Sequence, residues 1–490
     1  MPSNRVVRVR SVGDQGDDQA GDPAAAEALH QGIARIHAEL DLPLDFPADV
    51  LAAADVAAAD PRLPDLDRTE IPFITIDPEG SMDLDQALHI ERAGDGYVVH
   101  YAIADLAAFV TPGDPVDVES HARGETLYGA ESKVPLHPKV ISEDAGSLLA
   151  DQVRPALLWT IEVDETGEGT DVHVERARVR STAKLTYEAA QQAVDDGSAG
   201  EVLVLLQEIG ELRIQRDAVR GGVSLPLPEQ EIDIQGDHWV LEFRSMLPVE
   251  LWNAQISLLT GFAAASLMVY ARVGLLRTLP PPDPRDVQRL HRTARALGIE
   301  WPAEQLYPDF IRSLDPTDPK HAAMVVASAR LLRGSGYVAF DGEVPAEPQH
   351  AALVSEYAHV TAPLRRLADR YAGEVCVALC AGKPVPDWVL AALPGLPKTM
   401  QRSAQRARSY ERAVLDLVEA GVLAADVGEE FAGVVVSVDD KDPRRGVVMV
   451  EEPGVEALVV GETDLPLGTE VRVRLEVADV AARKVEFRLA

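Results

Sequence analysis

The sequence predicts an α+β protein built from a small helical part, a large mixed part and a small barrel of five strands. Strand-like segments gather after residue 69, helical segments follow them, and short alternating strands return after residue 430. Strands that precede helices in this way are typical of α+β domains. The chain has 490 residues, of which 46% are hydrophobic, and this is enough for roughly three folding units with sizeable cores.

Residues 1–68 predict a small helical domain. Apolar side chains recur at helical spacing in AAAEALHQGIARIHAEL, a second alanine-rich run DVLAAADVAAAD follows, and prolines end the unit. A helix-turn-helix pair is one arrangement that would fit this segment. Its 6 arginines face 13 acidic residues, which argues against a non-specific clamp for nucleic acid in this part.

Residues 69–425 predict a single large domain. The strand candidates are IPFITID, GYVVHYAIADL and a hairpin that joins LLWTIEV to VHVERARV through the turn DETGEG. Long helical segments follow, including ELWNAQISLLTGFAAASLMVYA and PLRRLADRYAGEVCVALC. Polar residues interrupt the uncharged run 251–271, so we expect a buried helix there and no membrane span.

Residues 430–490 predict a five-stranded barrel of the OB type. Apolar and polar side chains alternate around Val473 and again around Phe487, and three further short apolar runs precede them. This part has 8 basic and 13 acidic residues, and Phe431 and Phe487 are its only aromatic residues. It therefore offers few surfaces on which bases could stack.

The charge of the chain limits how it could handle a polyanion. There are 46 basic against 80 acidic residues, and the formal net charge is −34. Such a protein does not hold nucleic acid or an anionic membrane over its whole surface, so any polyanion would bind in a local groove. The N-terminus lacks the apolar core of a signal peptide, and we expect a cytoplasmic protein.

The stretch IPFITIDPEGSMDLDQALHI contains a cluster of carboxylates. Asp77 ends an apolar strand at a proline, and in extended chain the spacing of Asp83 and Asp85 places both carboxylates on one face. Three converging carboxylates repel one another unless a cation neutralises them, and an all-oxygen set suits Mg²⁺ or Mn²⁺ better than zinc. Such ions support attack on phosphate. The alternative is a solvated acidic turn.

A second motif, SEYAHVTAPLRRLADR, predicts a phosphate-binding helix start. Pro363 is tolerated in a first helical turn, so Arg365 and Arg366 would lie in the first turns of a helix. Exposed backbone N–H groups beside two guanidinium groups form a suitable cradle for phosphate. The alternative is an amphipathic helix whose arginines face solvent or pair with acidic residues.

A third motif, KTMQRSAQRARSYER, contains four basic residues and no acidic residue between Lys398 and Tyr410. Arg402 and Arg406 are one helical turn apart, which predicts a basic stripe. The stripe could line a groove for an RNA backbone, or it could dock onto an acidic neighbour.

Together and in this order, these segments resemble the ribonuclease II and ribonuclease R exoribonucleases, the RNB family. The family's acidic signature is resembled by ITIDPEGSMDLDQAL. Its next block is resembled by ARGETLYGAESKVPLHPKVISEDAGSLLADQVRPAL, and a short landmark after that block is resembled by AKLTYEAA. HAALVSEYAHVTAPLRRLADR resembles the second signature. The resemblance implies that residues 69–425 form an RNB catalytic domain and that residues 430–490 form an S1-type RNA-binding domain.

The resemblance implies processive, Mg²⁺-dependent hydrolysis of single-stranded RNA from the 3′ end, giving nucleoside 5′-monophosphates and a short end product. Asp77, Asp83 and Asp85 would hold the metal and the attacking water, and Arg365 would contact the scissile phosphate. Tyr128 matches the aromatic residue that stacks on a base near the 3′ end. The other expected RNA contacts are Arg366, Arg402, Arg406 and Glu411. We expect a monomer.

The departures from the family pattern favour a second interpretation. Gln86 stands where the family usually carries a fourth aspartate, and Ala362 and Leu367 replace polar residues of the second signature. The oxygen of the Gln86 amide can still ligate a hard cation, so we expect weaker metal binding and a shift toward Mn²⁺. One alternative is a catalytically weakened family member that binds RNA. Another is an acidic cation-binding scaffold that works through its N-terminal helices.

Overall fold

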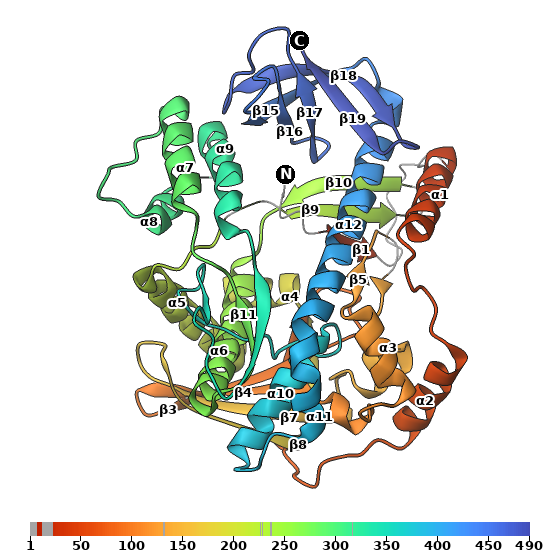
Figure 1. Cartoon of the computed structure of the whole chain (residues 1–490), viewed down its shortest axis with the longest axis vertical. Coiled ribbons are helices and arrows are strands. Elements are labelled where there is room, and N and C mark those ends of the chain that lie inside the picture. Colours follow the sequence, from red (N-terminus) through yellow and green to blue (C-terminus); the bar gives the residue numbers. More distant parts are fainter. Residues whose placement is uncertain are drawn as a thin grey trace.

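The structure is a computed structural model, and it contains two closed barrels joined by helices (Figure 1). The described residues are 7–11, 23–130, 133–225, 227, 229–235, 238–315 and 317–490. The α+β fold, the helical N-terminal region and the C-terminal barrel that the sequence predicts are confirmed.

The first barrel carries the acidic stretch on one of its loops. Its strands are β2 (Phe73–Asp77), β3 (Gln86–Ala93), β4 (Gly96–Ala104), β7 (Val153–Val163) and β8 (Gly169–Thr186). All neighbours run antiparallel except β2 and β8, whose parallel pairing closes the barrel. The predicted hairpin is the β7–β8 pair.

Helices cover this barrel and share a core with it. Trp159 of β7 and Tyr101 of β4 are buried in one apolar cluster with residues of three helices. These are Leu206 of α5 (Glu201–Arg220), Ile256 of α6 (Pro248–Ala271) and Tyr371 of α10 (Leu367–Cys380). By length and composition α6 could cross a membrane, but eleven of its side chains are buried and it packs against α5 and α10. The prediction of a buried helix is therefore confirmed.

The remaining elements of the large part are helices and short strands. The helices are η1 (Leu106–Ala108), α3 (Pro115–Arg123), η2 (Val140–Ala145), α4 (Tyr187–Asp195), α5 (Glu201–Arg220), α6 (Pro248–Ala271), α7 (Pro284–Leu297), α8 (Tyr307–Arg312), α9 (Pro319–Ser328), η3 (Ala329–Leu332), α10 (Leu367–Cys380), α11 (Asp387–Ala392), η4 (Leu393–Gly395), α12 (Leu396–Val422) and η5 (Ala424–Asp426). The strands are β5 (Leu127–Tyr128), β6 (Lys133–Val134), β9 (Glu229–Gln235), β10 (His238–Arg244), β11 (Val273–Thr278), β12 (Gly336–Asp341), β13 (Gln349–His350) and β14 (Ser355–Glu356).

The N-terminal region differs from the predicted helix-turn-helix. It contains β1 (Val7–Ser11), α1 (Pro23–Glu39) and α2 (Ala48–Ala59). The apolar face of α1 is buried against α12, whereas Val50 and Ala54 of α2 lie in the separate cluster that contains Phe109. The two helices therefore pack on different parts of the chain rather than on each other (Figure 1). The strand β1 was not predicted, and it pairs in parallel with β9.

The helix α12 connects the two ends of the molecule (Figure 1). Two glycines allow α1 and α12 to approach closely, because a Cβ at Gly32 would lie 2.5 Å from Leu417 and one at Gly421 would lie 2.5 Å from Leu29. At its C-terminal end α12 packs against the second barrel. This barrel is closed in the order β15-β16-β17-β19-β18, with β15 (Glu430–Val438), β16 (Arg445–Val450), β17 (Val455–Val460), β18 (Glu470–Asp479) and β19 (Lys484–Leu489).

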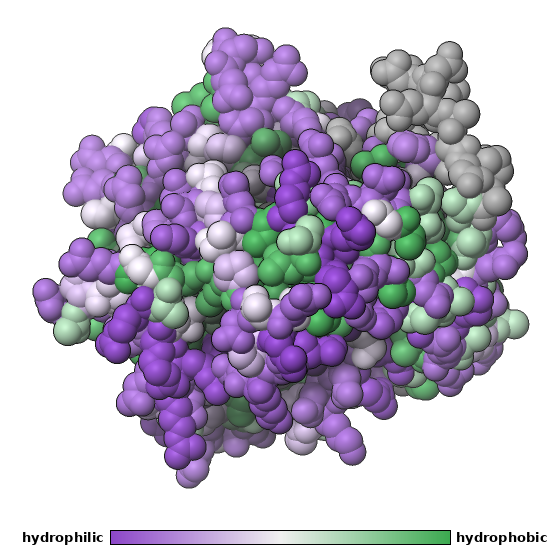
Figure 2. All heavy atoms as spheres, turned by 90° about the horizontal axis from the view of Figure 1, so that it is seen from above, coloured by the Kyte–Doolittle hydropathy of each residue, from purple (hydrophilic) through white to green (hydrophobic). Residues whose placement is uncertain are grey.

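The face of the molecule seen in Figure 2 is largely hydrophilic. Seen from above, most side chains on the visible face are hydrophilic, and hydrophobic side chains gather near its middle (Figure 2). A cavity of about 310 Å³ lies between α7, α9 and the strands β15 and β16. None of the site residues predicted from the sequence lines it.

Candidate active site

The acidic loop, residues 77–86, joins β2 to β3 at one edge of the first barrel. Asp77 is the last residue of β2, and Pro78 follows it, so the chain leaves the barrel at this point. Asp85 lies directly before β3, and Leu84 between the two later aspartates is fully buried. The loop is fixed by Ser147, whose hydroxyl accepts from the Leu84 N–H at 2.9 Å. The aspartates are thus held on a loop that is packed on one side.

Asp85 connects the acidic loop to the second signature. Its side chain is 4% exposed, and its Oδ1 accepts from the backbone N–H of Leu364 at 2.7 Å. The Arg365 guanidinium lies 3.6 Å from Oδ2. Burial raises the pKa of Asp85, and the Arg365 charge and the Leu364 N–H oppose this rise. Two motifs about 280 residues apart therefore meet at one carboxylate, as the family resemblance implies.

The pKa of Asp77 is affected by burial and by the charges of Asp83 and Arg365. Burial, followed by the neighbouring charge of Asp83, raises the pKa of Asp77 to about 7. Lys184 and Arg365 act in the opposite direction. Burial is the larger of the two causes and the charge of Asp83 the smaller, and a cation at this point would offset both by stabilising the ionised carboxylate.

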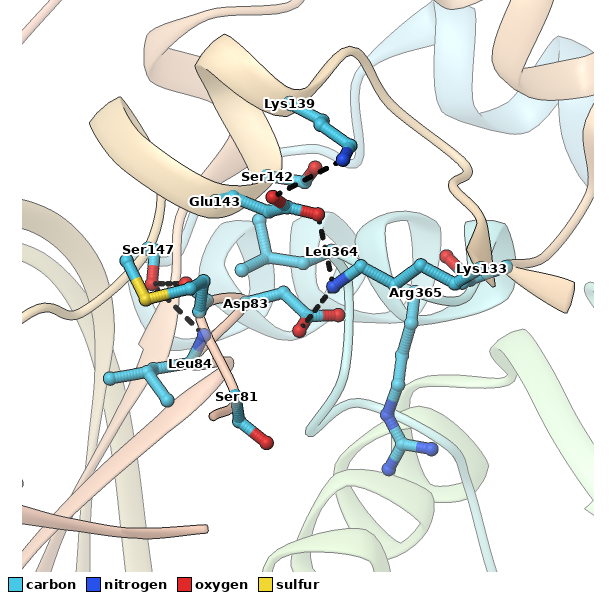
Figure 3. Close-up of polar contacts among 12 residues, drawn as sticks. Ser81, Asp83, Leu84, Lys133, Lys139, Ser142, Glu143, Ser147, Leu364 and Arg365 are labelled. Carbon is cyan, nitrogen blue, oxygen red and sulfur yellow. Dashed lines mark hydrogen bonds and ion pairs between the residues drawn. The ribbon is translucent and has the colours of Figure 1, made fainter. Parts of the chain in front are cut away.

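Asp83 is held by a lysine. The Lys133 ammonium lies 2.6 Å from Asp83 Oδ1 and 3.1 Å from Glu143 Oε1, so it is placed between two carboxylates (Figure 3). Lys139 approaches the other Glu143 oxygen at 4.0 Å. The sequence analysis did not identify Lys133 or Glu143, because a single lysine without basic neighbours gives no periodic or compositional signal.

The predicted metal ligands fit a divalent cation in their chemistry but not in their present arrangement. Asp77, Asp83 and Asp85 offer only oxygen atoms, the donor type that Mg²⁺ and Mn²⁺ prefer. Among the described residues, however, no three His, Cys, Asp or Glu side chains stand close enough to form a ready ligand group. The expected convergence of all three carboxylates is therefore incomplete, because Asp83 is turned to Lys133.

Gln86 has a structural partner in this chain. Its side-chain amide N–H donates to the backbone carbonyl of Thr361, in the second signature. A carbonyl oxygen accepts only, so the amide nitrogen must be the atom that faces Thr361. Gln86 thus provides a second tie between the acidic loop and the second signature, and an aspartate at this position could not donate this bond.

The start of α10 differs from the prediction. The helix begins at Leu367, so Arg365 and Arg366 precede it, and Pro363 lies in a turn rather than in the first helical turn. Asp369 explains this turn, because its carboxylate accepts from the Ala362 N–H at 2.8 Å and holds the chain in a loop before the helix. The arginines are therefore positioned by this loop and not by an exposed helix N-terminus.

The two arginines of the second signature have different environments. Arg366 donates to both oxygens of Asp369, at 3.0 and 2.9 Å, and this bidentate pair occupies its guanidinium. The side chain of Arg365 is 43% exposed, and within the described part of the chain its one ion pair is the 3.6 Å approach to Asp85. Of the two, Arg365 is the one placed to contact an incoming phosphate.

Tyr128 belongs to a hairpin that is joined to the second signature. It lies on β5 opposite Lys133 of β6, and directly opposed residues of an antiparallel pair project to the same face. The preceding segment pairs with the second signature, since the Thr126 N–H donates to the Arg365 carbonyl at 3.0 Å. Burial raises the pKa of Tyr128, the charge of Arg365 opposes this rise, and the charge of Asp83 adds to it. Tyr128 is therefore in the same site as Arg365 and Asp83.

A wall of aromatic side chains that the sequence analysis missed continues from this site. The Tyr337 hydroxyl lies 2.6 Å from His359 Nδ1, and Tyr357 meets the His359 ring edge-on at 5.5 Å. Arg277 lies 4.8 Å above the Tyr337 ring. Burial and then the charges of Arg366 and Arg277 lower the pKa of His359, so its ring is neutral. Aromatic faces beside guanidinium groups suit bases and phosphates together.

The basic stripe lies on α12, as predicted, but its members have different roles. Arg402 donates to the backbone carbonyls of His121 and Ala122 at 3.2 and 3.5 Å, where α3 ends. Burial and then the charge of Glu125 raise the pKa of Glu411 to about 7, and the positive charge of Arg408 opposes this rise.

Arg406 contributes a positive charge beside the buried Arg123, whose pKa burial lowers. Of the two predicted RNA contacts on the stripe, Arg402 thus bonds to the end of α3, and Arg406 lies near another positive charge.

Comparisons with known proteins identify the family of the chain. The RNB domain family matches residues 65–379, and the RNase II-type exonuclease C-terminal S1 domain matches residues 429–490. The exosome complex exonuclease RRP44 homolog A of Arabidopsis thaliana is 27% identical over 367 residues, which cover 71% of this chain and 39% of the relative. Ribonuclease R 1 of Lactococcus lactis is 25% identical over 418 residues, 80% of this chain and 49% of the relative. The chain thus spans less than half the length of these two curated relatives.

Solved structures show the same fold. RNase R of Mycoplasma genitalium, in complex with ribose methylated single-stranded RNA, superposes with a TM-score of 0.83 at 18% identity, over 95% of this chain and 78% of that one. Yeast Ssd1, described as a pseudonuclease, superposes with a TM-score of 0.67 at 15% identity, over 91% and 57%. The RNB match covers more than half of the chain, and the resemblance deduced from the motifs is confirmed. The chain belongs to the RNB family.

Proposed function

We propose that this chain is a metal-dependent exoribonuclease that degrades single-stranded RNA from the 3′ end, releasing nucleoside 5′-monophosphates and leaving a short end product. The observation that carries this proposal is the meeting of the acidic loop and the second signature at Asp85. Carboxylates suited to a hard cation thereby lie next to Arg365, a partly exposed guanidinium suited to phosphate. We further propose that the chain acts as a monomer in the cytoplasm.

Each named side chain has a role in this proposal. A divalent cation held by Asp77, Asp83 and Asp85 would supply positive charge and a polarised water at the scissile phosphate. Arg365 would contact a phosphate oxygen and stabilise the negative charge that develops there. Tyr128 would stack on a base near the 3′ end, which holds the strand without reading its sequence.

The same contacts explain how a single strand would be selected. The rings of Tyr337 and Tyr357 lie beside Arg277 and Arg366, and their faces are the surfaces on which bases would stack. Bases can stack on such faces only when they are unpaired. The site therefore suits single strands, while the acidic exterior of the chain repels nucleic acid elsewhere.

The second candidate is a catalytically weakened RNB protein that binds RNA. It is favoured by Gln86, whose amide is engaged with Thr361, and by the turn of Asp83 toward Lys133. The likeness to yeast Ssd1, named a pseudonuclease, supports it at the level of the fold.

A single experiment separates the two candidates. A 5′-labelled single-stranded RNA is incubated with the full chain in Mg²⁺ or Mn²⁺, with and without EDTA. We expect progressive shortening to a small fragment, which EDTA and Asp85→Asn both abolish. The asparagine keeps an oxygen that can accept from the Leu364 N–H, so this variant removes the charge and preserves the fold. Tight RNA binding without shortening in either metal would reject the nuclease and favour the second candidate.

A further inference from the structure

Lys133 is a built-in cation at the acidic loop. Its ammonium lies 2.6 Å from Asp83 Oδ1 and 3.1 Å from Glu143 Oε1, and its side chain is 22% exposed. The two acids are 14% and 19% exposed. The three groups come from separate segments, namely the acidic loop, β6 and η2, which meet in one place (Figure 3). This geometry is a half-buried bridge with one positive and two negative groups.

The hairpin that carries Lys133 fixes its direction. Because Lys133 pairs with Tyr128 across β5 and β6, both side chains project to the same face of the hairpin. That face is turned to the acidic loop, since the Lys133 ammonium lies 2.6 Å from Asp83 Oδ1. A flexible lysine at this position can therefore reach Asp83 without a change in the backbone.

We propose that Lys133 is a positioning residue that occupies Asp83 in the metal-free protein and sets how tightly the site takes a divalent cation, while Glu143 retains the lysine after it leaves Asp83. This inference rests on the proposed function for the identity of the ligand, a hard divalent cation. A cation that is to use Asp83 must first displace the ammonium, and it must then tolerate that positive charge nearby. Glu143 reduces this cost because it offers the ammonium a second carboxylate 3.1 Å away.

The experiment measures binding of Mn²⁺ to the full chain without RNA, from the electron paramagnetic resonance signal of free Mn²⁺. Lys133→Met removes the competing charge and keeps the length of the side chain, so we expect about tenfold tighter binding. Lys133→Arg keeps a cation at this position, and we expect it to restore an affinity close to that of the wild type.

Two further variants test the role of Glu143. With Glu143→Gln the ammonium keeps Asp83 as its charged partner among the residues that the structure describes, and we expect roughly threefold weaker Mn²⁺ binding. In the Lys133→Met background the same change should have no effect, because the group that it acts through is absent. Lys139→Met is the matched control, since Lys139 is 71% exposed and approaches the same Glu143 only at 4.0 Å. We expect Lys139→Met to bind Mn²⁺ as the wild type does.

The outcomes are distinct. A folded Lys133→Met that binds Mn²⁺ no more tightly than the wild type overturns the inference, as does an Asp83→Asn change that leaves the affinity unaltered. If Glu143→Gln weakens Mn²⁺ binding equally in the wild type and in the Lys133→Met background, Glu143 acts through a long-range charge effect. That result would also reject the inference. RNA shortening is assayed separately. An inactive chain that still shows the Lys133-dependent affinity would reject the proposed nuclease and leave the role of Lys133 standing.

Discussion

The two barrels of this chain share one architecture and differ in where their charges lie. Each has five strands, and in each a single parallel pairing closes an otherwise antiparallel sheet. Around the first barrel charges are buried, as in Asp105 and Glu374, which both bind Arg176. The strands of the second barrel carry exposed pairs such as Arg474 with Glu430 and Arg488 with Glu476.

This difference shows that the strand arrangement does not specify the chemistry. A buried charge costs free energy unless a partner compensates it, so a fold that retains several of them holds them by specific contacts. Exposed pairs are screened by water and contribute little. We therefore expect catalysis where charged side chains are buried, at the junction of the acidic loop with the second signature.

The largest effect should follow from breaking a buried pair beside the first barrel. Arg370 is 4% exposed and donates to Asp117 at 2.5 Å, and Asp117 is itself 7% exposed. Arg370→Met leaves that carboxylate without its partner, and we expect a loss of about 3–5 kcal/mol of unfolding free energy. Urea unfolding followed by tryptophan fluorescence measures it. Arg488→Ala in the second barrel is the control, with an expected change of about 0.5 kcal/mol or less. Equal losses would contradict the contrast between the barrels.

The next effect concerns the rate of RNA shortening. Arg365→Ala removes the exposed guanidinium beside Asp85, and we expect the rate to fall about 10²–10³-fold because one group that stabilises the transition state is lost. Unfolding should change little. Arg92→Ala, which breaks an exposed pair with Glu208 on the same barrel, controls for a general loss of positive charge. A rate that survives Arg365→Ala would remove this residue from the proposed mechanism.

The pH dependence of stability should have opposite signs at the two barrels. The pKa of Asp77 is about 7 in the folded chain and 3.8 in the reference state. The folded state therefore retains a proton between these values, and without metal its stability falls as the pH rises from about 4 to 7. Asp77→Asn should flatten this slope.

At the second barrel, Arg488 lowers the pKa of the exposed Glu476 through a hydrogen bond. This pair weakens when the pH falls, which is the opposite dependence. Glu476→Gln should therefore leave unchanged the loss of folding stability that accompanies a rise from about pH 4 to 7. Urea unfolding of both variants at several pH values in EDTA measures these slopes. An unchanged slope in Asp77→Asn would show that its carboxyl is not the titrating group.

The smallest effect in this series tests the tie made by Gln86. Gln86→Glu cannot donate to the Thr361 carbonyl, and we expect a loss of about 1–2 kcal/mol because a part-buried acceptor loses its partner. The exposed Gln401→Glu on α12 is the control, with a change within about 0.5 kcal/mol. If Gln86→Glu instead unfolds like the wild type and binds Mn²⁺ more tightly, the side chain is free to act as a metal ligand.

The parts of the fold that could be predicted from the sequence have strong local patterns. Alternation around Val473 and Phe487 predicts strands of the second barrel, because period-two burial leaves a direct trace in the sequence. The motifs that carry Asp85 and Arg365 could be brought together only through the family resemblance, since nothing in either segment alone specifies its partner.

The features that were mispredicted depend on contacts between distant residues. The apolar faces of α1 and α2 indicate that each helix is buried, but they do not specify the element that covers it. That α1 packs on α12 and α2 packs beside α3 could therefore not be predicted. The late start of α10 follows from Asp369 folding back to Ala362, which overrides the local preference of Pro363. Lys133 gave no signal because its importance comes only from the carboxylates of Asp83 and Glu143.

The packing of α1 on α12 has a consequence for synthesis of the chain on the ribosome. His37 lies 2.9 Å from the hydroxyl of Tyr410, 373 residues later, and Gly32 fits against Leu417. At about 5–20 residues per second, α12 emerges roughly 20–70 s after α1. During that interval the apolar face of α1 lacks its native contact with α12, so a chaperone or a transient contact would have to shield it until α12 has been synthesised.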